Sequence, residues 1–331
     1  MIRMPMSCAV SWAMLALAAA FSGGPAGAQN YPTKTITIIV PLAAGTGMDT
    51  LVRLYGEKLA QVLGRPVVVE NKPGAALALG AAAIATAPPD GHTMGVLTSG
   101  PMAIGPALYK KINYDPQKDF VPISLYVKSP LVLVVDPALP IKSVSDLIQY
   151  AKTSAKPLSY STPGAGAFQH LSTEFMAQRF GLKFTHVPYK STPQSVSDIA
   201  AGHVNFGFVE AGASLPLLRA GKVRALAVSS TTPLPTAPDV PTFAAAAKAP
   251  GFEAVSWHVL FAPAATPKDI VERLHREMTK VMSDEEMQKR AANIGLLPIS
   301  PPSIAETQKY IAAEREKWGS MVRKLGLAGT M

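Results

Sequence analysis

The sequence is nearly free of cysteine, because Cys8 is the only one among 331 residues. It lies in an N-terminal apolar segment that we expect to be removed, which leaves the remaining chain without a thiol. Disulfide bonds and cysteine metal sites are thereby excluded. The six histidines also lack the H-x-x-x-H and H-E-x-x-H spacings of common zinc sites. The sequence therefore indicates neither a metal site nor a bound cofactor.

Long hydrophobic runs are missing beyond the N-terminus. No later stretch reaches the roughly 18 consecutive apolar residues of a membrane-spanning helix. Residues 1–28 carry a single charge, Arg3, followed by an apolar run and an Ala-Gly-Ala tripeptide at 26–28. This pattern is typical of a secretory signal peptide that is cleaved near residue 28. We therefore expect an exported, soluble protein.

Charged residues are sparse, at 16% of the chain, and their formal net charge is +9. Loss of Arg3 with the signal peptide leaves +8 (9 minus 1), a charge that favours encounter with anions. The basic residues are scattered, and no zinc-finger or RNP-like motif accompanies them. The pattern argues against nucleic acid as a partner. An ordinary basic surface is the alternative to a charge that serves to attract anions.

Short β-branched runs alternate with helical periodicities, as is typical of α/β layers with largely parallel sheets. The length suggests about two domains of roughly 150 residues. Strands are predicted at residues 35–40, 66–70, 92–97, 131–135, 158–161, 184–187, 204–209, 225–229 and 255–261. Helices are predicted around 51–62, 144–152, 171–176, 267–282 and 303–326. Thr266 is the predicted N-cap of the fourth helix, with Pro267 in its first position.

Two strand-to-helix turns carry glycines: PLAAGTGMDT at 41–50 and STPGAGAFQH at 161–170. The first amides of a helix lack partners within the helix and lie at its positive end. Glycines let a ligand approach such amides closely, so each turn can bind an anion. The turns lie about 120 residues apart, roughly one domain. We therefore predict that two facing turns hold the two ends of a dianion; tight packing turns are the alternative.

Other motifs fit less well. A dinucleotide fingerprint needs a third glycine where Thr50 stands, and a P-loop needs lysine where Met48 follows Gly47. The stretch around Thr93 has the spacing of a nucleophile elbow, but threonine replaces serine and no oxyanion motif accompanies it. No catalytic residue is therefore predicted.

From residue 31 to about 327 the chain resembles the extracytoplasmic solute receptors of tripartite tricarboxylate transporters, the Bug family. The matching segments, in order, are YPTKTITIIVP, G-x-x-x-D, LGRPVVVENKPGAA, PPDGHTM, PALYKKINYDPQKDFVPIS, LIQYAK, STPGAGAFQHL, HVPYK, AAGHVNFGFVE, LLRAGKVRALAV, APDVPTF and SWHVLFAPAATPKDIVERL. No single segment is decisive, but their order behind a signal peptide is specific.

The resemblance implies an α/β, type II periplasmic-binding-protein fold, with two α/β lobes joined by two crossing strands and a ligand cleft between them. Lobe 1 is expected at residues 30–128 plus 256–331 and lobe 2 at 129–255. The resemblance further implies a periplasmic, monomeric receptor that is no enzyme. It would bind a small di- or tricarboxylate or aromatic acid and deliver it to the membrane permease subunits.

The resemblance also implies which positions contact the ligand. In lobe 1 these are Leu42, Ala43, Gly45, Thr46, Gly47, Asp49, Thr98 and Ser99. In lobe 2 they are Ser161, Thr162, Gly164, Gly166, Phe168, His170, Tyr189, Lys190 and Glu210. Asp49 is expected to brace its turn rather than to touch an anion.

Several interpretations stay open at this point. Phe168 either forms a wall that favours an aromatic or apolar acid, or is a core aromatic beneath the turn. Glu210 indicates a donor-bearing ligand, because a carboxylate opposes an anion unless it pairs with a donor; the alternative is a solvated acid. Lys190 either contacts the ligand or steers anions from the rim, and Trp257 is expected in the core. The competing functions are an exported α/β enzyme, an orphan receptor that feeds a sensor, and a regulator's effector domain.

Overall fold

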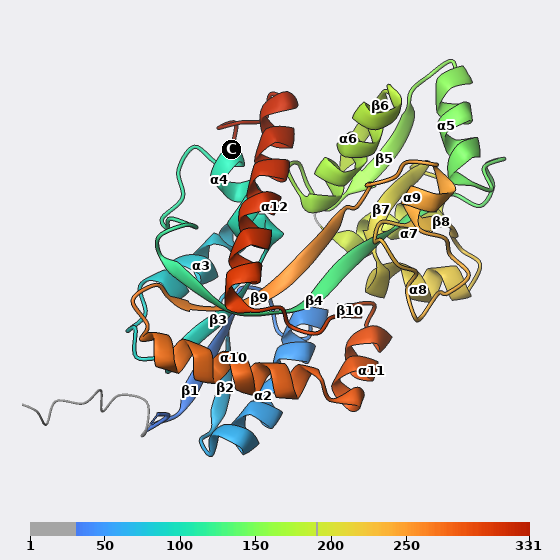
Figure 1. The fold of residues 1–331 in the computed structure, drawn as a ribbon. Coiled ribbons are helices and arrows are strands. Elements are labelled where there is room, and N and C mark those ends of the chain that lie inside the picture. The colour runs from blue at the N-terminus through green and yellow to red at the C-terminus, as the bar shows by residue number, and fades with distance from the viewer. Residues whose placement is uncertain (1–30, 190) are drawn as a thin grey trace, which may run out of the picture.

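The computed structural model describes residues 31–189 and 191–331 (Figure 1). The predicted signal peptide and Lys190 lie outside the described residues. Within the described residues, no helix is long and apolar enough to cross a membrane. In this described part of the chain, ten strands form one continuous mixed sheet with the order β2-β1-β3-β9-β4-β7-β5-β6, and both β8 and β10 pair with β4. Because β4 passes from one half of this sheet to the other, it joins two α/β halves.

The first half contains the parallel strands β2 (Val67–Asn71), β1 (Ile36–Val40) and β3 (Thr93–Thr98). β9 (Val255–Pro263) pairs antiparallel with β3, and β4 (Phe120–Val135) pairs antiparallel with β9. The carboxyl ends of β1 and β3 therefore lie at the same edge of the sheet, beside the strands that leave for the second half.

The second half begins where β4 changes its partners. The pairing of β4 with β9 ends at Pro130 and Val255, and its pairing with β7 (Phe206–Glu210) begins at Leu131. β5 (Leu158–Thr162) runs parallel to both β7 and β6 (Phe184–Pro188). β8 (Arg224–Val228) pairs with the end of β4, and the short β10 (Leu297–Pro298) pairs with its middle.

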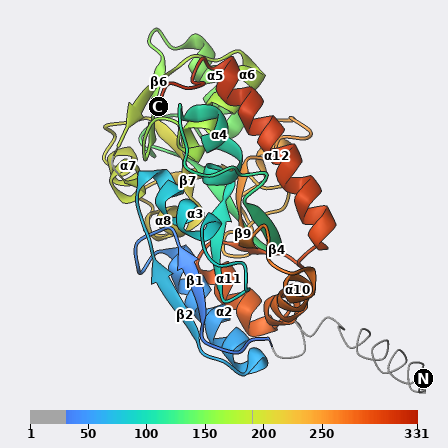
Figure 2. The same cartoon turned by 90° about the vertical axis from the view of Figure 1, so that its left-hand side faces the viewer.

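Helices cover both faces of the two halves (Figures 1 and 2). The longer ones are α2 (Gly47–Leu63), α5 (Val144–Thr153), α6 (Phe168–Phe180), α7 (Thr192–Ala200), α8 (Ala211–Arg219), α10 (Lys268–Met282), α11 (Glu285–Asn293) and α12 (Ile304–Lys324). The shorter ones are η2 (Ala75–Leu77), α3 (Ala78–Ala85), η3 (Gly100–Ile104), α4 (Gly105–Leu108) and α9 (Phe243–Ala246). α12 contacts η3 and α4 on one side and α6 on the other, so it touches both halves.

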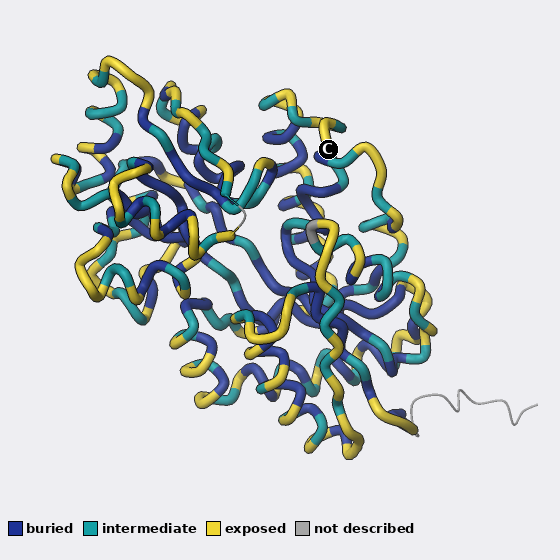
Figure 3. Tube along the Cα trace, turned by 180° about the vertical axis from the view of Figure 1, so that it is seen from behind, coloured by how far each residue is buried: buried dark blue, intermediate teal, exposed yellow. Residues whose placement is uncertain are grey.

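The core follows from the apolar strand faces. Figure 3 shows buried segments in the middle of each half and exposed segments on the outer turns. One cluster of buried side chains, which includes Leu97, Leu131, Phe206 and Trp257, extends across both halves. Burying such side chains removes apolar surface from water, the largest favourable contribution to folding. β4 and β9, the two crossing strands, are therefore packed against core side chains of both halves.

The structure confirms the alternating α/β pattern and contains a strand at each predicted run. It corrects two details. β4 begins at Phe120 instead of residue 131, because Pro122 and Pro130 interrupt the pattern without ending the strand. Proline normally argues against a central strand, and here the register with β9 shifts after Pro122. Pro267, not Thr266, is the N-cap of α10, and no described side chain caps that helix.

Candidate ligand-binding site

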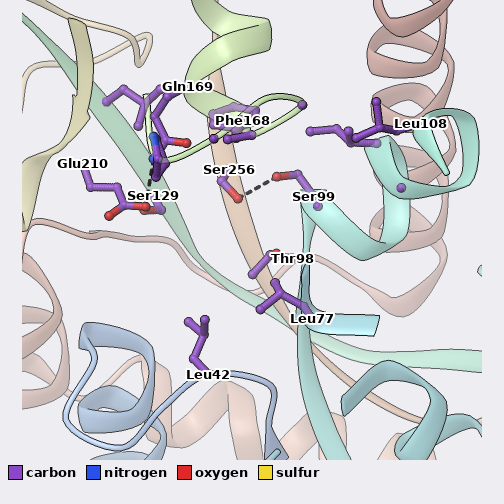
Figure 4. Close-up of a pocket in the computed structure, with 18 of the residues that line it drawn as sticks. Leu42, Leu77, Thr98, Ser99, Leu108, Ser129, Phe168, Gln169, Glu210 and Ser256 are labelled. Atoms are coloured by element: carbon purple, nitrogen blue, oxygen red, sulfur yellow. Dashed lines mark hydrogen bonds between the residues drawn. The ribbon is translucent and has the colours of Figure 1, made fainter. Parts of the chain in front are cut away.

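A cavity of about 580 Å³ lies where the two halves meet (Figure 4). It is lined by the β1–α2 turn, the end of β3 with η3 and α4, the two crossing strands, and the β5–α6 turn. The ends of β1, β3, β5 and β7 thus converge on one space, as is usual for ligand sites in open α/β sheets.

The cavity brings together seven of the predicted contact residues. These are Leu42, Thr98, Ser99, Gly164, Gly166, Phe168 and Glu210. Nine other predicted residues are described by the structure but do not line the cavity: Ala43, Gly45, Thr46, Gly47, Asp49, Ser161, Thr162, His170 and Tyr189. The hydroxyl of Tyr189 instead donates a hydrogen bond to Asp198, at 2.6 Å.

The first turn is held by an ionic network around Asp49, whose side chain is almost fully buried. The carboxylate of Asp49 accepts from the Gly45 amide at 2.9 Å, from Asn71 at 2.9 Å and from Arg53 at 3.1 Å. Thr46 Oγ1 caps α2 by accepting from the Asp49 amide at 3.3 Å. Burial raises the pKa of Asp49, but these hydrogen bonds outweigh it and hold that pKa below its ordinary value. Asp49 therefore braces the turn and occupies the Gly45 amide.

The second turn has the same arrangement without charge. The Gly166 amide donates to His170 Nδ1 at 3.0 Å, four residues along the chain, as Gly45 does to Asp49. The Gly164 amide donates to Thr162 Oγ1 at 3.2 Å. Thr162 Oγ1 also hydrogen-bonds His186 Nε2 at 2.6 Å. The amides of Gly45, Gly164 and Gly166 are thus used within the protein.

Stacked neutral rings support the second turn from below. The rings of His170 and His186 stack with centroids 4.1 Å apart, and Tyr160 stacks on His186 at 5.0 Å. Tyr160 donates to Glu174 at 2.6 Å. Burial and the neighbouring His170 lower the pKa of His186 to about 4, and Glu174 acts in the opposite direction. Burial also lowers the pKa of His170, so both rings are neutral near pH 7.

The two helix starts differ in their capping. Within the described part of the chain, α6 has no side-chain cap, whereas Thr46 caps α2. The first residues of α6, Phe168 and Gln169, line the cavity together with the N-cap Ala167. The first amides of an α-helix have no acceptor within the helix and sit at the positive end of its dipole. The start of α6 therefore offers donors to an anion in the cavity.

Glu210 and Gln169 form a polar pair on one side of the cavity (Figure 4). Gln169 Nε2 donates to Glu210 Oε1 at 3.1 Å. Glu210 is exposed to the water of the cavity, although the surrounding protein partly encloses its carboxyl. This enclosure raises the pKa of the Glu210 carboxyl, while hydrogen bonds from Gln169 and Thr192 act in the opposite direction.

The crossing strands supply the floor of the cavity. Ser99 and Ser256 share a hydrogen bond of 2.7 Å, and Thr98 lies opposite His258 in the ladder between β3 and β9. Burial lowers the pKa of His258 to about 4, and its Nδ1 has no partner among the described residues. The lining residues Leu77, Leu108, Ser129, Ser256 and His258 were not predicted from the sequence. The sequence did carry a signal for Ser256 and His258, because these polar residues stand two positions apart on a strand expected to cross the cleft.

Phe168 combines the two interpretations that the sequence left open. Its ring lines the cavity and also packs edge-on against Trp318 of α12, with centroids 4.9 Å apart. Trp257 is fully buried and does not line the cavity, which agrees with its expected place in the core.

Solved structures with this fold define the class of protein. The periplasmic binding protein BugD matches with a TM-score of 0.75 and 30% identity, over 90% of this chain and 99% of BugD. R. palustris Rpa4515, solved with adipate, matches with a TM-score of 0.78 and 33% identity, over 90% and 99% of the two chains. MatC from Rhodopseudomonas palustris, solved with bound malate, matches at 0.73 and 31%, over 88% and 100%. The fold is thus that of a periplasmic solute-binding protein, as predicted.

Sequence comparison identifies the family. Residues 51–327 match the tripartite tricarboxylate transporter family receptor. BugT of Bordetella pertussis (strain Tohama I) is 33% identical over 312 residues, which cover 94% of this chain and 95% of BugT. The chain therefore belongs to the tripartite tricarboxylate transporter receptor family. This family consists of solute-binding receptors rather than enzymes.

Proposed function

We propose that this protein is a periplasmic receptor that binds a small carboxylate between two lobes, residues 30–128 plus 256–331 and residues 129–255. The observation that carries the proposal is the uncapped start of α6 within the cavity between the two halves. Its relatives support the ligand class, because Rpa4515 was solved with adipate and MatC with malate. The ligand contacts proposed from the sequence are retained where they line the cavity.

The chemistry of binding follows from neutral donors. Amides at the start of α6 bind a carboxylate without bringing a cation, so no buried ion pair has to be desolvated. The hydroxyls of Thr98 and Ser99 at the end of β3, and of Ser256 on β9, also line the cavity and offer further hydrogen bonds, directly or through water. The formal charge of +9, or +8 without Arg3, favours the approach of an anion.

Closure of the lobes is proposed to occur about the crossing strands. β4 leaves β9 at Pro130 and Val255, so a small change in backbone angles there moves one half relative to the other. Two contacts meet across the cavity: Gly166 lies against Leu108, and Phe168 packs on Trp318. We propose that these contacts hold the two lobes closed. A membrane permease of the tripartite tricarboxylate type then recognises this closed form.

The function is tested by thermal unfolding of purified, ligand-free protein with citrate, short dicarboxylates, aromatic acids and acidic amino acids. A ligand specific for the folded state adds about 2.7 kcal/mol of stability at 100 times its Kd, which raises the Tm by several degrees. We expect such a shift with at least one acid and none with the matching amide. A shift with amides alone would contradict carboxylate binding.

A pair of charge variants on α6 locates the binding site. Gln169→Glu places a negative charge at the start of α6 inside the cavity, and should weaken binding of the active acid tenfold or more. Gln178→Glu makes the same change at an exposed position near the end of the helix, outside this cavity. It should leave the affinity unchanged. Equal effects of the two variants would place the site elsewhere.

A further inference from the structure

The cavity walls differ in chemistry from side to side (Figure 4). Leu77 and Leu108 come from the first half and Phe168 from α6, and all three side chains line the cavity. Glu210 and Gln169 lie on the other side of the space. The uncapped start of α6 stands between these two sides, because Phe168 and Gln169 are its first two residues. A bound molecule therefore meets three different environments around one carboxylate position.

The apolar side is maintained against a local backbone preference. Leu77 has a φ of 76°, in the left-handed region that residues with a side chain rarely adopt. Such a conformation persists only where surrounding structure over-determines it, and it often marks a binding site. Glycine would fit the backbone better at this position, so an apolar side chain at 77 indicates a use for its surface. That surface faces the cavity.

The polar side contains an acceptor. Among the described residues that line the cavity, Glu210 is the only one with a charged side chain. One carboxylate oxygen of Glu210 accepts from Gln169. A carboxylate close to a bound anion is unfavourable unless the ligand carries a donor next to its own carboxylate.

The first turn is less suited to a carboxylate than the second. Asp49 occupies the Gly45 amide, and Thr46 Oγ1 occupies the Asp49 amide. Asp49 itself is negatively charged and would repel a second anion there. The start of α6 is therefore the better placed of the two turns for a carboxylate.

We propose that the ligand is a monocarboxylic acid with a hydroxyl or ammonium group on carbon 2 and an apolar side chain. Its carboxylate binds the start of α6, its donor binds Glu210, and its side chain packs against Leu77, Leu108 and Phe168. This inference rests on the proposed function, and it narrows the ligand class of the same site.

The test compares acids that differ in one group at a time, by calorimetric titration of ligand-free protein. The probes are 2-hydroxy-3-phenylpropanoate, L-phenylalanine, 3-phenylpropanoate without the donor, lactate without the apolar group, and adipate with a second carboxylate. We expect a donor-bearing phenyl acid to bind about tenfold more tightly than 3-phenylpropanoate, the gain typical of a hydrogen bond to a charged acceptor. Lactate and adipate should bind more weakly still.

Two variants assign the effects to the two sides. Leu77→Gly should weaken the phenyl acids about tenfold and leave lactate unchanged, because a lost apolar wall affects only ligands that touch it. Ala75→Gly is the matched control, since Ala75 also has a positive φ, 45°, but does not line the cavity. Glu210→Met should abolish the advantage of the donor without weakening 3-phenylpropanoate.

Each outcome decides between the ideas. If 3-phenylpropanoate equals its 2-hydroxy analogue, the role of Glu210 is wrong, whereas carboxylate binding stands. If adipate binds most tightly, the single carboxylate position is wrong. If Leu77→Gly and Ala75→Gly act alike on the phenyl acids, the apolar wall is wrong. If no acid binds at all, the proposed function itself fails.

Discussion

The two glycine turns solve one structural problem with different chemistry. In each, a glycine amide donates to a side chain four residues later, which is Asp49 in the first turn and His170 in the second. The first acceptor is an anion paired with Arg53, at 3.0 Å. The second is a neutral imidazole stacked on another. An ionised brace repels a ligand's carboxylate, whereas a neutral brace leaves the adjacent helix start available to it.

The surroundings of the two turns agree with this difference. Residues 43–45 of the first turn are exposed, and Thr46 caps the following helix. The second turn lines the cavity from Pro163 to Ala167 and touches Leu108 across it. A similar strand-turn-helix layout thus serves mainly to hold the structure together in one half, whereas in the other half the turn lines the cavity.

Removal of the Asp49 carboxylate should have the largest effect. Asp49→Ala removes a buried acceptor from the Gly45 amide, Asn71 and the half-exposed Arg53, so we expect a loss of about 3 kcal/mol in the free energy of unfolding. His170→Ala, the corresponding change in the second turn, frees one amide and should cost less. Urea unfolding measures both. Equal losses would contradict the distinction between the two braces.

Acidification should weaken the protein through the second turn. The pKa of His186 is about 4 in the folded protein and 6.5 ordinarily, so the unfolded chain binds more protons between these values. The stability is complete above pH 6.5 and decreases as the pH falls towards 4. We expect His186 to contribute about 1 to 2 kcal/mol of loss at pH 5. Asp49, whose pKa is lowered, stays ionised there, so the first turn should not respond.

The measurement is urea unfolding at pH 7.5 and pH 5, with two variants. His186→Gln keeps a hydrogen-bonding group near Thr162 but does not titrate, so the difference between the two pH values should shrink by that amount. His203→Gln, at a position with a 70% exposed side chain, is the control and should retain the full difference. An unchanged pH dependence in His186→Gln would show that other groups, such as the buried His258, cause the loss.

Contact between the lobes depends on the absence of a side chain at Gly166. Gly166→Ala meets a positive φ of 73° and places a methyl group against Leu108, whereas Gly181→Ala meets a φ of 64° with nothing near it. Both variants should lose about 1 kcal/mol of stability. Only Gly166→Ala should also weaken ligand binding, about tenfold, and Leu108→Ala should restore part of that loss in the double variant, because it removes the clash together with some of the apolar wall. Titration with the best acid checks this, and equal affinities of the two glycine variants would exclude a role for the contact.

The sequence predicted the framework of this site better than its chemistry. Strand runs and glycine spacing located both turns, because local propensity and backbone requirements act within a few residues. The bracing role of Asp49 was predicted, but the engagement of the Gly45 and Gly166 amides was missed, since it depends on where the side chains of Asp49 and His170 turn back. Ser129 and Ser256 were missed because a residue on a crossing strand becomes a cavity residue only through the pairing of β4 with β9. The proline-interrupted part of β4 concealed that pairing.

The smallest effect is expected from adding a side-chain cap to α6, a change that tests the difference between the two turns directly. Ala167 is the N-cap of α6, with an extended backbone (φ −61°, ψ 156°) that suits serine. A serine hydroxyl there can accept from a free amide two or three residues on, as Thr46 does in α2. Ala167→Ser should therefore raise the free energy of unfolding by about 0.5 to 1 kcal/mol. The same hydroxyl occupies a donor that the carboxylate needs, so affinity should fall several-fold while stability rises.

A matched cap-strengthening change at Pro267 of α10, Pro267→Ser, lies outside the cavity and should leave affinity unchanged. If Ala167→Ser stabilises the protein without weakening the ligand, the amides at the start of α6 do not bind the carboxylate, and the difference between the two turns is structural only.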